Sequence, residues 1–360
     1  MTVSTDLQPH YQVDGYEAFT ALAFEKQWSD GLPLVPPTPH VITQFLDSVD
    51  LAPDTVIGTV PSRDIEITAE VVAANAVMAG CSVEHMPTVL AAARAHLSPL
   101  GNSHCVTATI MGAAQIVILN GPIRTRLGVI SGDGAFGPGS RANATIGRAL
   151  RLIVRNGVGS VPGGADRAGY SNPGRYSFCF GEDEERSSWT PLHVERGFAP
   201  DEDVVTVASV TDCYAMFERD GGDPESFLRR LSRLARCRPI LPDGYLGENR
   251  FVLLVIGQHH RALLERAGWS KADVRAFVYP LLAAPHTHGA GVSCDHGMHP
   301  AGDSAACSLD GVEKADNVLI VAAGGDEPPL SWVIYSHMAA AISTPIVSRY
   351  EPNVKLVPAY

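Results

Sequence analysis

Cys81 lies at the junction of two predicted helices, within the segment Ala79-Gly-Cys-Ser-Val-Glu-His85. Gly80 suits the end of the first helix and Ser82 the N-cap of the second, so Cys81 is expected at a helix N-terminus. Unpaired N–H groups and the helix dipole stabilise a thiolate there, and His85, within one turn, can act as its base. The segment predicts a cysteine nucleophile, and the alternative is a small thiol packed between two helices.

A glycine-rich loop at residues 131–140 precedes a predicted helix that begins with polar residues. Its glycines have the spacing of a dinucleotide-binding loop, but Pro138 stops a helix from beginning inside the motif and Arg155 stands where an acid is needed, so we expect neither NAD nor FAD. The loop and helix start instead favour an anionic group such as a carboxylate, although a plain connection capped by Ser140 is the alternative. The predicted substrate-binding residues are Asn120, Gly137, Arg141, Asn143, Thr145 and Arg196.

An acidic stretch follows the apolar residues 178–180 and leads to His193. A strand that ends in carboxylates and is followed by an imidazole can bring an acid and a base to the rim of one pocket. Glu182 and His193 are therefore predicted as catalytic acid–base residues, together with His85. The alternative is a solvated acidic loop, which accounts for Asp183 and Glu185 without a catalytic role.

Histidines concentrate in the segment Pro285-His-Thr-His-Gly-Ala-Gly-Val-Ser-Cys-Asp-His-Gly-Met-His299. Four of the chain's 13 histidines fall here, and imidazole together with thiolate suits Zn, Fe or Cu. The spacing matches no structural zinc module, so the alternative is a loop of hydrogen-bonding histidines. The predicted ligands of a transition metal are His286, His288, Cys294, His296 and His299.

Alternating strand and helix patterns must position these residues. Strands are predicted at 115–119, 127–130, 176–180, 204–210, 250–256 and 317–322, with helices at 41–45, 69–79, 84–96, 142–154 and 224–235 and a helical pair around Gly268. This order favours an α/β or α+β fold, with mixed sheets and flanking helices in one compact, multi-lobed chain. We divide the chain into an extended arm with a short helix (1–50), an α/β core with the cysteine motif and glycine-rich loop (51–200), and a second α/β lobe with the histidine-rich loop (201–360).

The composition excludes several function classes. The chain has 27 Lys and Arg against 39 Asp and Glu, a net charge of −12, and no basic block, which disfavours a nucleic-acid partner. The longest strongly apolar run, 251–256, is too short to span a bilayer and the first twenty residues lack a signal-peptide pattern, so we expect a cytoplasmic protein without a membrane partner. Seven cysteines, an odd number, argue against a disulfide framework.

Motifs spread along the chain resemble those of a group of uncharacterised bacterial proteins with an Ala-Gly-Cys motif. They are Asp30-Gly-Leu-Pro-Leu-Val-Pro-Pro-Thr38, Asn75-Ala-Val-Met-Ala-Gly-Cys81, Asn120-Gly-Pro-Ile123, Phe136-Gly-Pro-Gly139 with Arg141-Ala-Asn-Ala-Thr-Ile-Gly-Arg148, Gly268-Trp-Ser-Lys-Ala-Asp-Val274 and Val321-Ala-Ala-Gly-Gly325. The family is associated with short UGSC-motif (seleno)proteins, as neighbours or fused partners. The resemblance covers nearly the whole chain and implies that Cys81, residues 141–145 and residues 193–197 belong to a functional core. The histidine-rich stretch departs from the family's usual shorter connection.

These features leave three functions open. The first is a homo-oligomeric lyase or hydrolase that acts on a small carboxylate-bearing metabolite, with Cys81 as nucleophile or metal ligand. The second is a transition-metal enzyme that uses the loop at 286–299, where the metal polarises the substrate or activates water. The third is a non-catalytic subunit that presents a ligand to a small thiol or selenol partner of the UGSC type.

Overall fold

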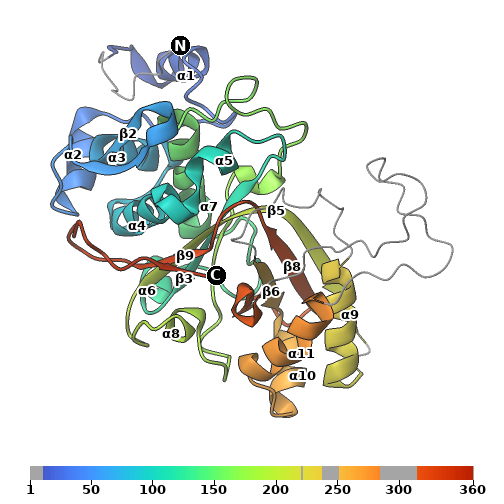
Figure 1. Cartoon of the computed structure of the whole chain (residues 1–360). Coiled ribbons are helices and arrows are strands. Elements are labelled where there is room, and N and C mark those ends of the chain that lie inside the picture. Colours follow the sequence, from blue (N-terminus) through green and yellow to red (C-terminus); the bar gives the residue numbers. More distant parts are fainter. Residues whose placement is uncertain (1–10, 220–221, 237–250, 284–313, 360) are drawn as a thin grey trace, which may run out of the picture.

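The computed structural model describes residues 11–219, 222–236, 251–283 and 314–359. A mixed sheet with helices on its outer faces forms the centre of the molecule (Figure 1), which confirms the predicted α/β class. A separate hairpin consists of β1 (Val56–Val60) and β2 (Ile65–Thr68). The strands of the large sheet are β3 (Ala114–Asn120), β4 (Cys179–Gly181), β5 (Val204–Phe217), β6 (Val252–Ile256), β7 (Val318–Ala322), β8 (Leu330–Ser336), β9 (Ile342–Pro345) and β10 (Val357–Pro358).

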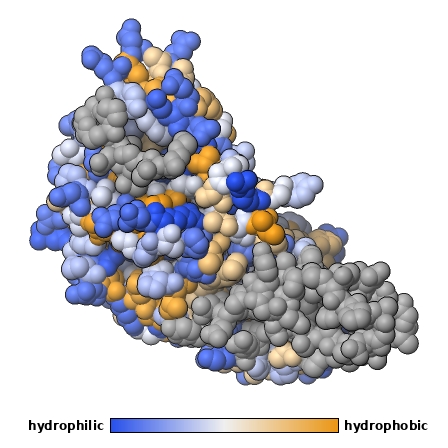
Figure 2. All heavy atoms as spheres, turned by 45° about the horizontal axis from the view of Figure 1, so that its top comes forward, coloured by the Kyte–Doolittle hydropathy of each residue, from blue (hydrophilic) through white to orange (hydrophobic). Residues whose placement is uncertain are grey.

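The helices cover the outside of this sheet. They are α1 (Gly15–Glu25), α2 (Pro39–Asp47), α3 (Ala69–Ala79), α4 (Met86–Leu97), α5 (Ser103–Thr107), α6 (Ile123–Leu127), α7 (Arg141–Leu152), α8 (Leu192–Glu195), α9 (Pro224–Arg236), α10 (Gln258–Arg266) and α11 (Lys271–Ala283). Among the described helices, none has both the length and the apolar character needed to cross a bilayer. On the face drawn in Figure 2, hydrophobic side chains are scattered among hydrophilic ones.

Strand β5 is central to the sheet because its two halves pair with different strands. Its first half pairs antiparallel with β3 on one side and β9 on the other, and its second half pairs with β8, after an irregularity between Val210 and Cys213. Strand β8 continues the sheet to β6, and β6 pairs parallel with β7. Strands from residues 51–200 and from residues 201–360 therefore share one sheet.

The sheet curls until its outer strands meet. The Asp183 N–H, just beyond β4, donates a 2.7 Å hydrogen bond to the Ala322 carbonyl at the end of β7. The concave interior is filled by apolar side chains from β3, β4, β5, β6 and β7, with Phe180 and Val321 fully buried. Burial of this surface drives the curl, and the backbone contact fixes where the curl ends.

Helices α3, α4 and α7 pack on the half of the sheet that contains β3 and β9 (Figure 1). Thr68 caps α3 by accepting from the Val71 N–H, and Gly80 ends the helix with a φ of 91°. Alanines dominate the buried face of α3, so the backbones of α3 and α7 approach closely. Helices α9, α10 and α11 cover the other half, beside β6, β7 and β8.

Most predicted elements are confirmed. The capping box of Ser270 and Asp273 forms as predicted, with reciprocal bonds of 2.9 and 3.2 Å. The arm predicted as extended contains α1, and the hairpin of β1 and β2 is not predicted. Further differences concern the large sheet. The predicted strand at 127–130 is wrong, because α6 ends at Leu127 and residues 128–130 are irregular. Strand β5 extends seven residues beyond its predicted end, from 210 to 217. Strands β8, β9 and β10 follow the strand predicted as the last one.

Candidate functional site

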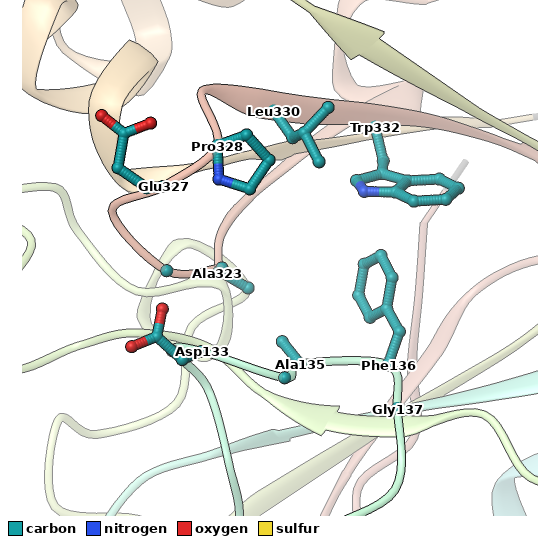
Figure 3. Close-up of a pocket in the computed structure, with 13 residues that line it drawn as sticks. Asp133, Ala135, Phe136, Gly137, Ala323, Glu327, Pro328, Leu330 and Trp332 are labelled. Carbon is teal, nitrogen blue, oxygen red and sulfur yellow. The ribbon is translucent and has the colours of Figure 1, made fainter.

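The glycine-rich loop lines a cavity of about 410 Å³ (Figure 3). Residues 132–137 form one side, and residues between 323 and 332, from the end of β7 to β8, form the other. The Gly324 N–H donates a 2.8 Å hydrogen bond to the Ser131 carbonyl, which joins these two distant segments. Gly137, a predicted substrate-binding residue, lies in this lining.

Phe136 forms the inner wall of the cavity. Its φ of 76° places the backbone in the left-handed region, which non-glycine residues seldom adopt. Its ring packs edge-on against Phe180, Phe178 and Trp332, with centroid distances of 4.7, 5.1 and 5.6 Å. Such aromatic pairs each contribute about 0.5–1.5 kcal/mol beyond their buried area, which offsets the cost of the backbone conformation.

Asp133 and Glu327 supply the charge of this cavity, and both side chains are exposed. Figure 3 shows Asp133 on the glycine loop and Glu327 on the opposite segment. Asp133 lies directly against Gly325, where an added Cβ would stand 1.5 Å from Asp133 Oδ1, so a side chain at position 325 would displace the Asp133 carboxylate. The cavity thus combines an acidic opening with an aromatic inner wall.

Asp133, Glu327 and Trp332 give the cavity its charge and much of its aromatic wall, and none of them has a role predicted from sequence. Glu327 and Trp332 belong to no motif that indicates chemistry, and only the folded sheet brings them to the glycine loop. Asp133 stands inside that loop, and a carboxylate among glycines is the one signal that points to it.

The residues predicted to work with Cys81 do converge, where α3 meets α7. The Thr145 carbonyl accepts a 3.4 Å hydrogen bond from Cys81 Sγ, and Thr145 Oγ1 lies 3.3 Å from His85 Nδ1. Arg141 donates to the carbonyls of Gly80 at 3.0 Å and Cys81 at 3.3 Å. Its guanidinium therefore ties α7 to the end of α3.

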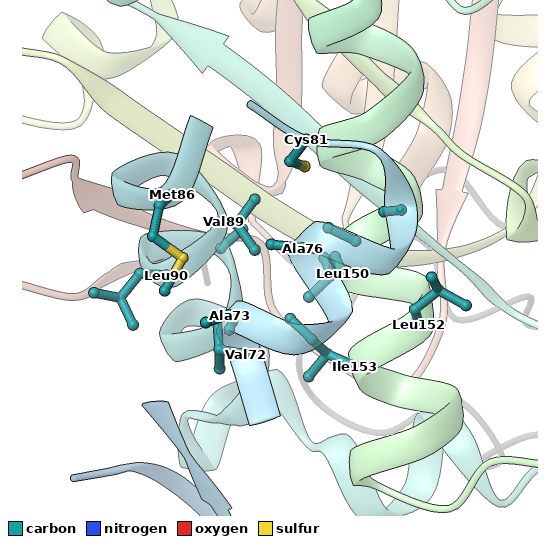
Figure 4. Close-up of a cluster of buried hydrophobic side chains, with 14 of the residues drawn as sticks. Val72, Ala73, Ala76, Cys81, Met86, Val89, Leu90, Leu150, Leu152 and Ile153 are labelled. Atoms are coloured by element: carbon teal, nitrogen blue, oxygen red, sulfur yellow. The ribbon is translucent and has the colours of Figure 1, made fainter. Parts of the chain in front are cut away.

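Burial gives Cys81 a different chemistry from the one expected. Its side chain packs among apolar groups of α3, α4 and α7 (Figure 4), and this burial raises the pKa of Cys81 to about 12. The thiol is therefore protonated at neutral pH, whereas the sequence predicts a thiolate. His85 Nδ1 accepts the Ser82 N–H at 3.4 Å in a capping box, and burial lowers the pKa of His85. Among the hydrogen bonds of the described residues, none joins Cys81 to His85.

Asn143 and Arg196, predicted to bind an anion, contact backbone in this structure. Asn143 holds residue 130 from both sides, accepting its N–H at 2.8 Å and donating to its carbonyl at 3.1 Å, and it also donates to the Cys179 carbonyl at 3.0 Å. Arg196 donates to the carbonyls of Ala341, at 3.0 Å, and Val357. Burial lowers the pKa of Arg196 to about 10. Asn143 thus fixes the backbone before α7, and Arg196 fixes β9 and β10.

Glu182, Asn120 and His193 also come together, but inside the molecule. Asn120 Nδ2 donates to Glu182 Oε2 at 2.7 Å and to Glu184 Oε1 at 2.9 Å. His193 Nδ1 lies 4.0 Å from Glu184 Oε1. Glu182 is 2% exposed and His193 is fully buried, so the prediction that they stand at a pocket rim is wrong.

The acids after β4 form ion pairs that seal the curled sheet, and the pairs of Glu182 and Asp183 are buried. Glu182 pairs with Lys271, at the start of α11, at 2.7 Å, and both side chains are 2% exposed. Asp183 pairs with Arg261 of α10 at 3.0 Å, and Arg124 of α6 pairs with the next two acids in the chain. A buried charge with a partner is tolerated, whereas the same charge alone is strongly unfavourable. These pairs therefore determine how α6, α10 and α11 meet the end of β4.

The predicted metal ligands at 286–299 lie outside the described residues. Within the part of the chain that the structure describes, no group of three or more His, Cys, Asp or Glu is arranged to hold a metal ion. A transition metal on the histidine-rich segment therefore stays a prediction.

No protein-family model and no curated protein matches this chain. The resemblance to the UGSC-associated group rests on the sequence motifs and stays a prediction. The assignment of a function therefore depends on the geometry of the cavity.

Replacement of Lys271 by Met tests the seal. The substitution leaves Glu182 as an unpaired buried acid, and we expect it to lower the free energy of unfolding by about 3–5 kcal/mol in urea titrations. The double variant Lys271→Met/Glu182→Gln should recover more than half of this loss. Glu225→Gln, which breaks an exposed pair with Arg229, should cost less than about 1 kcal/mol. A loss below 1 kcal/mol for Lys271→Met would contradict the role of the pair.

Alkylation of the folded protein tests the state of Cys81. A pKa raised to about 12 leaves roughly a thousandfold less thiolate at neutral pH than an ordinary thiol has. With iodoacetamide at pH 7.5, we expect the half-buried Cys105 to react before Cys81, as followed by peptide mass spectrometry. In urea the two should react at similar rates, and rapid labelling of Cys81 in the folded state would restore the nucleophile hypothesis.

Elemental analysis tests the metal prediction. Purified without chelator, a protein with a three- or four-ligand transition-metal site should retain about one Zn, Fe or Cu per chain. The variant His286→Ala/His288→Ala should lose this metal. Less than about 0.1 metal per chain in the unaltered protein would rule out a tightly bound ion.

Proposed function

We propose that this chain is an enzyme that binds a small organic cation in the glycine-loop cavity. The observation that carries the proposal is the pairing of two carboxylates, Asp133 and Glu327, with the aromatic wall of Phe136 and Trp332. Among the described residues that line the cavity, none is Lys or Arg. Arg186 lies beside Gly132 and Gly324, outside this lining, and its charge is paired with Asp183 and Asp326. Carboxylates and aromatic faces both attract an ammonium group, and such a group is held more strongly as it loses water.

This polarity replaces the carboxylate-bearing substrate predicted from sequence with a cationic one. Arg141 and Asn143, the basis of that prediction, bind backbone carbonyls away from the cavity lining. Backbone freedom in the glycine loop still matters here, because it lets Asp133 approach the segment at Gly325 closely.

The reaction that we propose is hydrolytic or lyase-like, with Asp133 and Glu327 as the groups that exchange protons with the substrate. Two carboxylates on opposite sides of one cavity can serve as acid and base when the bound molecule places them in different surroundings. The position of these two side chains in the cavity lining supports this chemistry. Cys81, the nucleophile predicted from sequence, does not line the cavity and is buried where α3 meets α7.

Calorimetric titration with three simple probes tests the proposal. Propylamine and tetramethylammonium should bind, and propionate should not. Asp133→Asn and Glu327→Gln should each weaken amine binding about tenfold, because a hydrogen bond to a charged group contributes about 1.5–3 kcal/mol. Binding should also weaken at high salt, since the two carboxylates are exposed.

Glu225→Gln is the control. Glu225 is an exposed acid of α9 that does not line the cavity, so its replacement should leave amine binding unchanged. Propionate that binds as tightly as propylamine, or amine binding that ignores Asp133 and Glu327, would refute a cation site here.

A further inference from the structure

A second cavity, of about 650 Å³, lies beside the first and shares two wall residues with it, Phe136 and Trp332. The rest of its lining comes from Met111, from residues 170–178 and from the second half of β5, between Thr211 and Tyr214. The Phe136 and Trp332 rings, which face each other in Figure 3, meet edge-on at 5.6 Å. Both residues line both cavities.

Aromatic side chains are concentrated in this second cavity. Five of its 14 lining residues are aromatic, whereas aromatic residues make up 7% of the chain, which would give about one. They are Phe136, Tyr170, Phe178, Tyr214 and Trp332. Tyr170 is 93% exposed, although a ring of this size normally buries much of its surface. An exposed ring at the edge of an aromatic cavity offers a face to a bound molecule.

The Asn172 side chain in the second cavity is hydrogen-bonded to backbone groups. Asn172 donates to the Thr211 carbonyl at 2.6 Å and accepts the Gly174 N–H at 2.7 Å, which holds the two sides of the cavity together. Asp212 is the charged residue in the described lining, and Lys and Arg are absent from that lining. The cavity therefore suits a planar apolar group, alone or next to positive charge, and disfavours an anion.

We propose that the two cavities form one bipartite site for an elongated arylalkyl amine. The ammonium group lies at Asp133 and Glu327, the alkyl chain passes along Phe136 and Trp332, and the aromatic end lies in the second cavity beside Tyr170. This inference rests on the cation site proposed above and adds the class of group that occupies the neighbouring space. It makes Tyr170 a specificity-determining residue for the tail of the substrate.

A series of ω-phenylalkylamines with two to six methylene groups tests the bipartite site, with propylamine as the head-group reference. Burial of a phenyl ring contributes enough to expect that the best member binds at least tenfold tighter than propylamine in calorimetric titrations. Tyr170→Ala should remove most of this gain and leave propylamine binding unchanged. Because the Tyr170 side chain is so exposed, the variant should keep the melting temperature of the unaltered protein.

Tyr176→Ala is the matched control, since Tyr176 is an exposed tyrosine near the second cavity that does not line it. It should leave the affinity for the whole series unchanged. The bipartite site is wrong if propylamine binds through Asp133 and Glu327 but none of the phenylalkylamines binds more tightly than propylamine. It is also wrong if the gain in affinity survives Tyr170→Ala. In both cases the cation site stands. If neither propylamine nor any member of the series binds, the cation site itself fails.

Discussion

The closure of the curled sheet at the end of β4 is the constraint on which the rest of the molecule depends. At this point Glu182 and Asp183 enter the interior, where each needs a cation, and the partly buried Glu184 pairs with Arg124. Lys271 and Arg261 come from helices of one outer layer, and Arg124 comes from the segment after β3. Since these partners are far apart in sequence, the pairs can form only when both halves of the sheet are in place. The closure therefore couples the two halves into one folding unit.

The cavity follows from this closure. Asp183 binds Arg261 and Arg186, and Arg186 reaches the Gly324 carbonyl at 3.2 Å and Asp326 at 3.4 Å. The same charged group that seals the sheet thus positions the connection between β7 and β8, which forms one side of the cavity. The glycine loop forms the other side and is fixed by its own bond to Gly324. A rigid frame of this kind lets Asp133, Phe136 and Trp332 keep their positions before any ligand arrives.

Local sequence predicts local structure well in this chain and predicts the site poorly. The cap at Thr68, the stop at Gly80 and the capping box at Ser270 are short-range signals, and each holds. The chemically suggestive residues Arg141 and Asn143 have the donors of a ligand site, but backbone carbonyls use those donors once the chain folds. Lys271 and Trp332 carry no local signal, because their roles depend on residues that lie far away in the sequence. The closure of the sheet joins residues that are distant in the sequence, so the periodicity and spacing of residues do not predict it.

The central claim is that an amine occupies the glycine-loop cavity with its charge between two carboxylates. A crystal structure of the protein with the tightest ω-phenylalkylamine tests it most directly. We expect the ammonium within about 3 Å of Asp133 and Glu327, as charge-assisted hydrogen bonds require, and the phenyl ring beside Trp332 and Tyr170. Density for the amine elsewhere on the molecule, with this cavity holding only solvent, would contradict the account.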